Sequence, residues 1–395
     1  MNEPKLRFKA DDGSQFPEWK KKKLEDVVEF LDGQRKPLEA GQRVSGKYPY
    51  YGASGIIDYV EDYIFDEELI LLSEDGANIL DRNYRVCFLA KGKYWVNNHA
   101  HVLRAMDGNV NGFICEQLET FDYRKYNSGG AQPKLNQATC RAIIMNMPSR
   151  PEQQKIAEFL STIDTVIKKQ KETVSAWEER KKGVMQKLFS QEVRFKADDG
   201  SDFPEWEEKK LGDISERILV GLATTVTPYY REKGRPMFRN LNIKQGYLDD
   251  RDMLFLDDDY ADSQKNKAIH FGDILTVHTG NIGWSCLVPE KYEGALSFTT
   301  LITTVKFNVV SNKYVCDFLN SPLGMNRMQN LAFSGGRANL NTSEFQKVQV
   351  PVPCLAEQQK IADCLSLLDE VIEKQKATLS AWEELKKGLL QQMFV

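Results

Sequence analysis

The sequence predicts an α+β protein with a pseudo-twofold internal repeat: two mixed α/β domains separated by two long helices that pair with each other as a coiled coil. Two observations predict this architecture. A loop-like phrase, RFKADDGSQFPEW at residues 7–19, returns as RFKADDGSDFPEW at residues 194–206. A helical stretch at residues 151–189 also returns, at residues 356–394. The order of phrase, insert and helix therefore occurs twice in the chain.

The position of the phrase suggests a ring that has been cut open once. The first helical stretch runs directly into the second phrase, and the second helical stretch ends the sequence. Joining the two termini would place the N-terminal phrase after the C-terminal helix, as residues 194–206 follow the first helix. We therefore expect two equal halves and chain termini that lie close together.

The repeated helical stretches, placed at residues 151–190 and 354–395, carry an apolar stripe with a seven-residue period. Such a stripe, sustained over more than four heptads, is typical of a coiled coil. A glutamine interrupts it at the same position in both copies, where a polar residue usually fixes register or partner choice. The stripe of the expected spacer includes Ile163, Gln170 and Trp177 in the first copy and Leu368, Gln375 and Trp382 in the second.

The two inserts lie in domains expected at residues 1–150 and 191–353. In the first, YIFDEELILLS, YRVCFLA and HAHVLRAM read as strands separated by turn residues. In the second, GDILTVHT, WSCLVPE and ALSFTTLITTVKF do so. Only their last third is similar in sequence, as SGGAQPKLN at residues 128–136 against SGGRANLN at residues 334–341. A shared frame around two divergent inserts suits a protein that recognises two different targets at a fixed separation.

The length, composition and cysteine content favour a globular protein of the reducing cytoplasm. A chain of 395 residues is too long for one ordinary core, and it contains no apolar run that could span a bilayer. Its first residues lack the apolar core of a secretory signal. The seven cysteines are scattered, with no CxxC pair that would indicate a zinc knuckle. A net charge of −4 does not itself indicate nucleic acid, although an interface requires only local basic residues.

No catalytic motif is present. The sequence has no GxxxxGK[ST] phosphate loop, and TPYY at residues 227–230 lacks the acidic or amide residue expected of a methyltransferase motif. His99 and His101 would share one strand face, but a metal site requires a third ligand, and none is suitably spaced. We therefore expect neither catalytic residues nor a metal in this chain.

Polar clusters beside aromatic residues are the remaining candidates, and they suit contact with nucleic acid. Arginine and asparagine can each make two hydrogen bonds to a base edge, whereas lysine and serine more often hold phosphates. Taken singly, each of these residues is better explained as a solvated loop residue than as a base contact, and the glycines could equally serve a strained turn. The candidates of the first insert are Lys47, Tyr48, Tyr51, Ser54, Asn97, Asn98, His99, His101, Ser128, Gly129, Gly130, Gln132 and Lys134. Those of the second are Arg235, Arg239, Asn240, Asn242, Lys244, His278, Thr279, Asn281, Ser334, Gly335, Gly336 and Arg337.

The doubled frame EQQKIAxxL…D…I…KQK…W…KKG, each copy closing an insert that ends in SGG…LN, resembles the specificity subunit of a type I restriction–modification enzyme. The resemblance covers essentially the whole chain. It implies that each insert is a target recognition domain for one half of a bipartite, asymmetric site in double-stranded DNA. It also implies that the two long helices form an antiparallel coiled coil that sets the gap between the half-sites. Among the candidate residues, it supports mainly the Ser-Gly-Gly loops.

The resemblance further implies a division of labour. Two modification subunits would bind S-adenosylmethionine and methylate adenine, and two restriction subunits would bring ATP- and Mg-dependent translocation and cleavage. This chain would bind none of these cofactors itself. Two alternatives stay open: a protein–protein scaffold whose inserts bind partners, and a solitary methyltransferase or nuclease, which the missing motifs disfavour.

Overall fold

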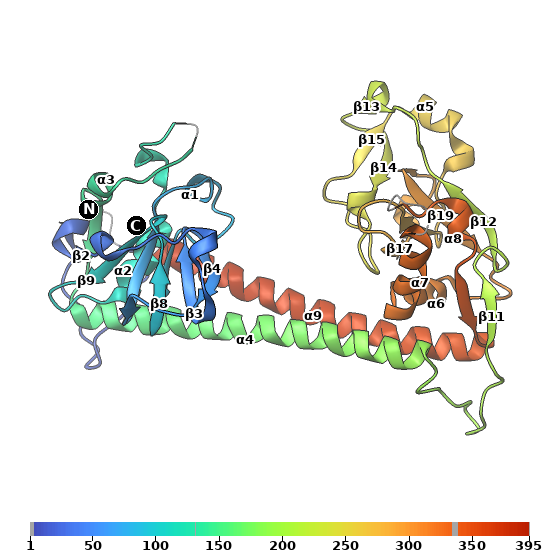
Figure 1. Ribbon diagram of the computed structural model, residues 1–395, viewed down its shortest axis with the longest axis horizontal. Helices are drawn as coiled ribbons and strands as arrows, with labels where there is room; N and C mark the ends of the chain where they lie inside the picture. Colours follow the sequence, from blue (N-terminus) through green and yellow to red (C-terminus); the bar gives the residue numbers. More distant parts are fainter. Residues whose placement is uncertain (1–3, 131, 334–338, 395) are drawn as a thin grey trace. The chain divides into compact units, whose positions relative to one another are not determined.

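The structure is a computed structural model that describes residues 4–130, 132–333 and 339–394. It divides into two compact units, coloured by sequence in Figure 1. Unit 1 consists of Met1–Lys171 and Ala377–Val395, and unit 2 consists of Glu172–Lys376. Each unit thus contains one phrase, one insert and a part of both long helices. Among the described residues, no helix is long and apolar enough to cross a membrane.

The two repeated stretches form the long helices α4 (Arg150–Phe189) and α9 (Leu355–Met393). Within unit 1 they run in opposite directions, since Asp164 pairs with Lys386 at 2.6 Å and Lys171 pairs with Glu383 at 2.8 Å. Within unit 2, Lys181 pairs with Asp369 and Lys376 pairs with Glu178 in the same antiparallel sense. The predicted antiparallel pairing is therefore confirmed within each unit (Figure 1).

The apolar stripe of both helices is buried, as the heptad pattern predicts. It packs into the main core of unit 1 at one end of α4 and into that of unit 2 at the other. Gln170, Trp177, Gln375 and Trp382 are half-buried at their stripe positions. The stripe members at most 9% exposed are Ile156, Leu160, Ile163, Ile167, Val174, Leu188, Ile361, Leu365, Ile372 and Met393.

The described residues of unit 1 form three sheets. The antiparallel sheet β2-β9-β6-β7 carries the main core on one face, where helix α2 (Asn111–Thr120) covers it. A mixed sheet, β4-β3-β8-β5, contains one parallel pair, β3 with β8, and a two-stranded sheet joins β1 to β10. The strands are β1 (Lys20–Lys23), β2 (Val28–Phe30), β3 (Ser45–Gly52), β4 (Gly55–Val60), β5 (Phe65–Asp66), β6 (Leu69–Ser73), β7 (Cys87–Ala90), β8 (Lys93–Val96), β9 (Ala100–Ala105) and β10 (Ile144–Met147). The short helices are α1 (Asn78–Asp81) and α3 (Gln137–Arg141).

Unit 2 repeats this plan with different side chains. Its sheets are the antiparallel β12-β19-β16-β17, the mixed β13-β15-β14-β18 with one parallel pair, and the two-stranded β11-β20. The strands are β11 (Glu207–Lys210), β12 (Ser215–Val220), β13 (Tyr230–Arg231), β14 (Arg235–Arg239), β15 (Leu254–Leu256), β16 (Ile274–Val277), β17 (Ser285–Leu287), β18 (Leu296–Phe298), β19 (Thr300–Val305) and β20 (Gln349–Val352). The helices are α5 (Asp258–Ser263), α6 (Asn312–Asn320), α7 (Pro322–Phe333) and α8 (Thr342–Phe345). The inserts thus share the strand order of their antiparallel sheets, although their sequences are similar only near the end. Their mixed sheets differ at the edge, where β5 pairs with β8 in unit 1 and β13 pairs with β15 in unit 2.

Each copy of the repeated phrase binds the start of a long helix through an arginine. Arg7 donates two hydrogen bonds to the Glu152 carboxylate, at 2.8 and 3.0 Å, and a third to the carbonyl oxygen of Pro17. In unit 2, Arg194 makes the matching contacts with Glu357. Both glutamates are fully buried in the first turn of their helix, where the helix dipole also favours a carboxylate. Each unit needs its own phrase because each unit contains the start of one helix.

The two phrases also follow a helix end in the same way. The backbone N–H of Leu6 donates to the carbonyl oxygen of Gln392, near the end of α9, at 3.1 Å. The N–H of Val193 donates to the carbonyl oxygen of Lys187, the matching residue of α4, at 3.3 Å. The N-terminal segment therefore lies against the C-terminal helix as the second phrase lies against the first helix, which supports the predicted ring.

A circular permutant that joins Val395 to Met1 through a short linker and opens between Ser190 and Gln191 is therefore expected to fold. In this permutant the Val193 to Lys187 hydrogen bond joins the segments at the two new chain ends, as the Leu6 to Gln392 hydrogen bond does in the parent chain. The new ends therefore lie near each other, and no buried element is cut. We expect a Tm within about 5 °C of the parent chain in a thermal unfolding experiment. A control opened inside α4 between Leu160 and Ser161 cuts the helix where Leu160 and Ile163 are buried in the core of unit 1, and it should fail to fold. A permutant as unstable as that control would contradict the ring.

Candidate nucleic-acid interface

Three of the predicted polar segments meet at the end of strand β6 in unit 1. The N–H of Glu74, just beyond the strand, donates to the carbonyl oxygen of His99 at 2.9 Å. The N–H of Leu135 donates to the carbonyl oxygen of Glu74 at 2.7 Å, which attaches the Ser-Gly-Gly loop. The N–H of Asn97 donates to the carbonyl oxygen of Tyr51 at 3.0 Å, which brings in the end of β3. Segments far apart in sequence thus form one polar cluster.

His101 lies at the buried centre of this cluster. Its Nδ1 lies 2.7 Å from an Asp32 oxygen and its Nε2 lies 2.8 Å from the carbonyl oxygen of Leu135. Both oxygens can only accept, so both ring nitrogens donate and the ring is an imidazolium. Although burial opposes the charge, the hydrogen bond to Asp32 raises the pKa of His101 to about 10. The ring therefore fixes the loop carbonyl to the sheet.

Ion pairs link the exposed part of the cluster to this centre. Arg35 donates to Glu74 at 2.7 Å and to the carbonyl oxygen of Ala100 at 2.7 Å. The Lys134 ammonium lies 3.3 Å from the same glutamate, and its side chain is 49% exposed. His99, 48% exposed, has its Nδ1 2.9 Å from Asp75. Positive and negative groups are balanced here, so the surface offers both donors and acceptors.

The Ser-Gly-Gly loop of unit 1 depends on one glycine for close backbone packing. A Cβ on Gly129 would lie 2.0 Å from the carbonyl oxygen of Gln132 and 2.8 Å from the nitrogen of Lys134. Asn127 Oδ1 accepts from the N–H groups of both Gly129 and Lys134. Gly130, by contrast, faces open space. The first glycine is thus required by a close approach, which the sequence alone could not distinguish from a strained turn.

The candidates of unit 1 divide into exposed and supporting residues. Asn98, Ser128 and Gln132 are exposed beside His99 and Lys134. Asn97 is 4% exposed, and its side chain accepts from the N–H of His99, so it supports the turn. The Tyr51 ring packs on Phe88 and Tyr94, and burial raises the pKa of its hydroxyl.

Strand β3 carries the remaining candidates of unit 1. Ser54 is exposed just beyond its end. Lys47 and Tyr48 lie nearer its other end, where the Tyr48 ring contacts Tyr63 and the Lys47 ammonium. The structure therefore does not bring Lys47 and Tyr48 into the cluster.

Unit 2 builds a matching cluster at the end of strand β16. The N–H of Leu340 donates to the carbonyl oxygen of His278 at 2.9 Å, as Leu135 does to Glu74 in unit 1. The Nδ1 of His278 lies 2.7 Å from Asn339 Oδ1. Asn240 Nδ2 donates to the carbonyl oxygen of Thr279 at 3.4 Å, which joins the end of β14 to the same place. The two predicted polar stretches of the second insert are thus brought together.

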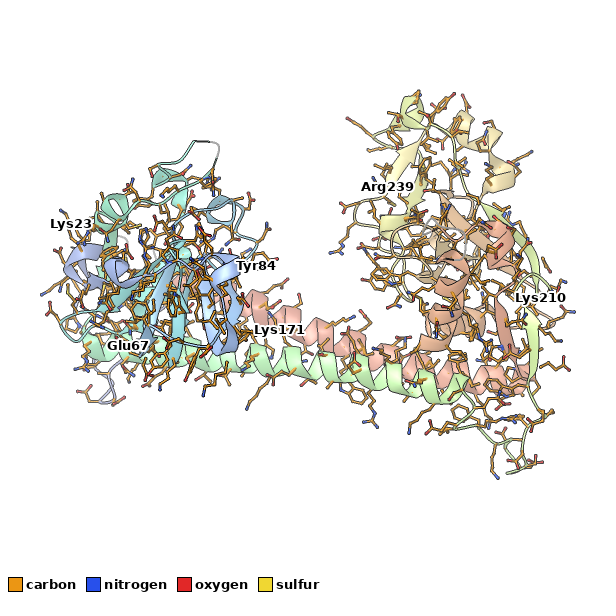
Figure 2. The ribbon with its side chains drawn as sticks, in the orientation of Figure 1. Lys23, Glu67, Tyr84, Lys171, Lys210 and Arg239 are labelled. Atoms are coloured by element: carbon orange, nitrogen blue, oxygen red, sulfur yellow. The ribbon has the colours of Figure 1, made fainter. Side chains whose placement is uncertain are left out.

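The arginines of the second insert differ in their surroundings. Arg235 is held by Asp262 and by the carbonyl oxygen of Gly294. Arg239, labelled in Figure 2, donates to the carbonyl oxygen of Asp252 and has its Nε buried without a partner among the described residues. Asn242 is 1% exposed and supports the turn that follows Arg239.

Three further candidates of unit 2, Lys244, Thr279 and Asn281, lie at least partly at the surface. The predicted second Ser-Gly-Gly loop, with Ser334, Gly335, Gly336 and Arg337, lies outside the described residues.

Sequence reasoning missed the residues that hold the clusters together. Asp32, Arg35, Glu74 and Asp75 surround the two histidines of unit 1, and Asn339 holds His278 in unit 2. The acidic pair after an apolar strand in LILLSED was the available signal, because polar residues at a strand end commonly line sites. The described residues contain no group of three or more side chains suited to hold a metal ion.

The charged state of His101 predicts a pH-dependent stability. Its pKa in the folded protein is about 10, above the ordinary value of 6.5, so the stabilisation is fully present below pH 6.5. It is lost as the pH rises toward 10. We expect the free energy of unfolding of the parent chain, minus that of His101→Gln, to fall steadily between these values in urea titrations. A difference independent of pH would contradict a charged His101.

Comparison with known proteins follows the same division of the chain. The family model for the type I restriction modification DNA specificity domain matches twice, at residues 17–175 and 204–381. A putative type I restriction enzyme specificity subunit of Haemophilus influenzae is 26% identical over 89% of this chain and 87% of its own. The MjaVIII specificity subunit of Methanocaldococcus jannaschii is 23% identical over 97% of this chain and 94% of its own.

Solved structures agree on the fold. The crystal structure of a type I restriction–modification S subunit from M. genitalium superposes with a TM-score of 0.60, covering 100% of this chain and 99% of that one at 15% identity. A chain from a study of type I complex assembly and conformational transition gives a TM-score of 0.53 at 15% identity. With two family domains in series around a doubled helical frame, the chain belongs to the type I restriction–modification DNA specificity family.

Proposed function

We propose that each unit of this DNA specificity subunit reads one half of a bipartite, asymmetric target in double-stranded DNA. The observation that carries the proposal is the pair of polar clusters at the ends of β6 and β16. They are built by matching backbone contacts, at Leu135 and at Leu340, but from different side chains. A common geometry with different donors and acceptors is what two unlike half-sites require.

The exposed members of each cluster are the proposed DNA contacts. In unit 1, Asn98 and Gln132 offer paired donor and acceptor groups for adenine, and Lys134 offers a charge for phosphate or guanine. In unit 2, Asn281, which is exposed, and Arg239, which is half-buried, have the corresponding chemistry for adenine and guanine. The buried residues His101, Asn97 and Asn242 hold the contacting backbone in place and do not themselves reach DNA.

The paired helices are proposed to set the number of base pairs between the half-sites and to provide the docking frame for partner subunits. We propose two modification subunits, carrying S-adenosylmethionine, and two restriction subunits, carrying ATP and Mg. In this scheme the chain itself is not catalytic, and the complex acts in the cytoplasm. The absence of a phosphate loop in the sequence supports this division of labour.

Methylome sequencing tests the proposal. The chain would be expressed with the modification subunit encoded beside it in a host that lacks other adenine methylation. We expect methylated adenines within one bipartite motif, and no methylation when this chain is omitted. Methylation that continues without the chain would contradict its role in recognition. A complex that forms but binds no DNA would instead indicate a protein scaffold.

A further inference from the structure

A cleft of about 1360 Å³ lies within unit 1, apart from the polar cluster described above. Its lining residues come from β1, β10, the end of α2, the segments at residues 82–85 and 121–126, and helices α4 and α9. Tyr84 and Lys171, both labelled in Figure 2, are among them. All of these residues belong to unit 1, so the cleft is complete within it.

The cleft carries an excess of positive charge. Each carboxylate in its wall already has a cation: Glu119 pairs with Arg82, Asp164 with Lys386, Glu383 with Lys171 and Asp122 with Arg124. Lys21 on β1, Lys125 after α2 and Lys387 on α9 also line it and are exposed. Within the part of the chain that the structure describes, none of these three lysines has an ion-pair partner. The cleft therefore favours a ligand that carries negative charge.

Gln117 adds an acceptor that lacks a donor. Its side chain lines the cleft and is 3% exposed. Its Nε2 donates to the carbonyl oxygen of Asn146 at 2.9 Å, which fixes the orientation of the amide because a carbonyl can only accept. Its Oε1 has no hydrogen-bond partner among the described residues. A buried acceptor in this state is stabilised when a donor from a bound group reaches it.

Unit 2 fills the corresponding place with its own side chains. Helix α6 matches α2, since Cys115 and Glu116 correspond to Cys316 and Asp317, which puts Phe318 at the position of Gln117. The Arg327 guanidinium lies over the Phe318 ring, 5.7 Å from its centroid. It also pairs at 2.9 Å with Glu208, which stands at the position of Lys21. At these two matched positions, the lysine without an ion-pair partner and the amide oxygen without a donor therefore occur in unit 1 and are replaced in unit 2.

We propose that this cleft binds an acidic polypeptide segment of a partner subunit, and that it does so only on the unit 1 side of the chain. Carboxylates of the segment would pair with Lys21, Lys125 and Lys387, and a backbone N–H would donate to Gln117. Tyr84, 68% exposed, and Ile144, 45% exposed, offer apolar contact to the same segment. A DNA backbone suits the site less well, because a phosphodiester has no hydrogen to donate to Gln117. The identity of the segment's owner as a partner subunit rests on the proposed function.

Titration of the full chain with a fluorescein-labelled, glutamate-rich peptide containing one central phenylalanine tests the proposal. Reversing the three lysines together, as Lys21→Glu, Lys125→Glu and Lys387→Glu, should weaken peptide binding at least about tenfold. Gln117→Leu, which keeps the volume but removes the acceptor, should weaken it about fivefold. The matched control reverses three exposed lysines of unit 2, Lys182, Lys233 and Lys265, and should change binding less than about twofold.

Equal weakening by both triple variants would overturn the proposal, because the peptide would then sense only net charge. A cleft variant that loses binding to random-sequence duplex DNA, but not to the peptide, would also overturn it and mark a nucleic-acid surface. The lysines are exposed, so both triple variants should keep the parent Tm. This titration and the methylome experiment can fail independently. The parent chain directs methylation, or fails to do so, whatever the cleft binds.

Discussion

A fragment that ends at Ser190 is expected to form a homodimer that directs methylation to a palindrome, made from the first half-site and its inverted repeat. The fragment keeps one phrase, one insert and the whole of α4. It loses residues 377–395, the part of α9 that completes unit 1. The second half of α4 in another copy can replace that part, since Trp177, Leu188 and Phe189 correspond to Trp382, Met393 and Phe394.

A charge pair between the two helices makes this replacement specific. Asp164 pairs with Lys386 in unit 1, and Lys181 pairs with Asp369 in unit 2. Lys181 and Lys386 occupy the same position of the repeat, so in the homodimer Lys181 of one copy should pair with Asp164 of the other. The side chain of Lys386 is 11% exposed and lies 3.3 Å from Glu116, also 11% exposed, as well as 2.6 Å from Asp164, which is 43% exposed. A carboxylate in place of this lysine would therefore face two negative charges, one of them buried.

Lys181→Glu in the fragment should therefore weaken dimerisation by at least about a hundredfold, which sedimentation equilibrium can measure. The matched control is Lys182→Glu, whose side chain is 63% exposed and should have little effect. Combining Lys181→Glu with Asp164→Lys should restore part of the affinity. The restoration should be incomplete because Arg85, 3.9 Å from Asp164, would lie close to the new lysine. A fragment that remains monomeric and supports no methylation at any concentration would contradict the ring, since separate chains lose only effective concentration.

Inserting four residues into both long helices, next to Gln170 and Gln375, is expected to widen the gap in the methylated motif by about one or two base pairs. Four helical residues add about 6 Å, and one base pair rises about 3.4 Å. The insertion points lie within one or two residues of the boundaries between the units, at Lys171 and at Lys376, so both units should stay intact. The bases of each half-site should not change.

Two controls sharpen this measurement. A seven-residue insertion in both helices preserves the heptad register and should widen the gap by about three base pairs. An insertion in α4 alone shifts the register of one helix against the other and should abolish methylation. Half-site bases that change while the gap stays constant would contradict the role of the helices as a spacer.

The frame of the protein could be predicted from sequence because its signals are periodic and repeated. The heptad stripe located both long helices, their equivalence indicated that they pair with each other, and the family resemblance implied that they run antiparallel. The lysine at the stripe positions 181 and 386 was the visible sign of the charge pairs between the helices, since a charged residue is rare at such a position. The phrase could be recognised in the sequence as a junction between the two halves. That it binds the start of a long helix became visible only with the contact between Arg7 and Glu152 in the structure.

The sites were harder to predict because long-range contacts decide which polar residues are exposed. Asn97, His101 and Asn242 looked like surface groups in sequence, yet each is at most 4% exposed. The carboxylate Asp32, 69 residues before His101 in sequence, compensates its burial. Gly129 gave no sign of its tight contact, and the cleft of unit 1 depends on residues at both ends of the chain. Local sequence carries no record of such partners.

Methylome sequencing of a domain exchange tests the central claim most directly. Residues 28–147 would be replaced by the corresponding insert of a relative with a known target, leaving the phrase, both helices and unit 2 unchanged. Independent reading by the two units predicts a motif in which one half-site takes the relative's bases, while the other half-site and the gap stay as they were. A motif altered in both halves, or in neither, would contradict it.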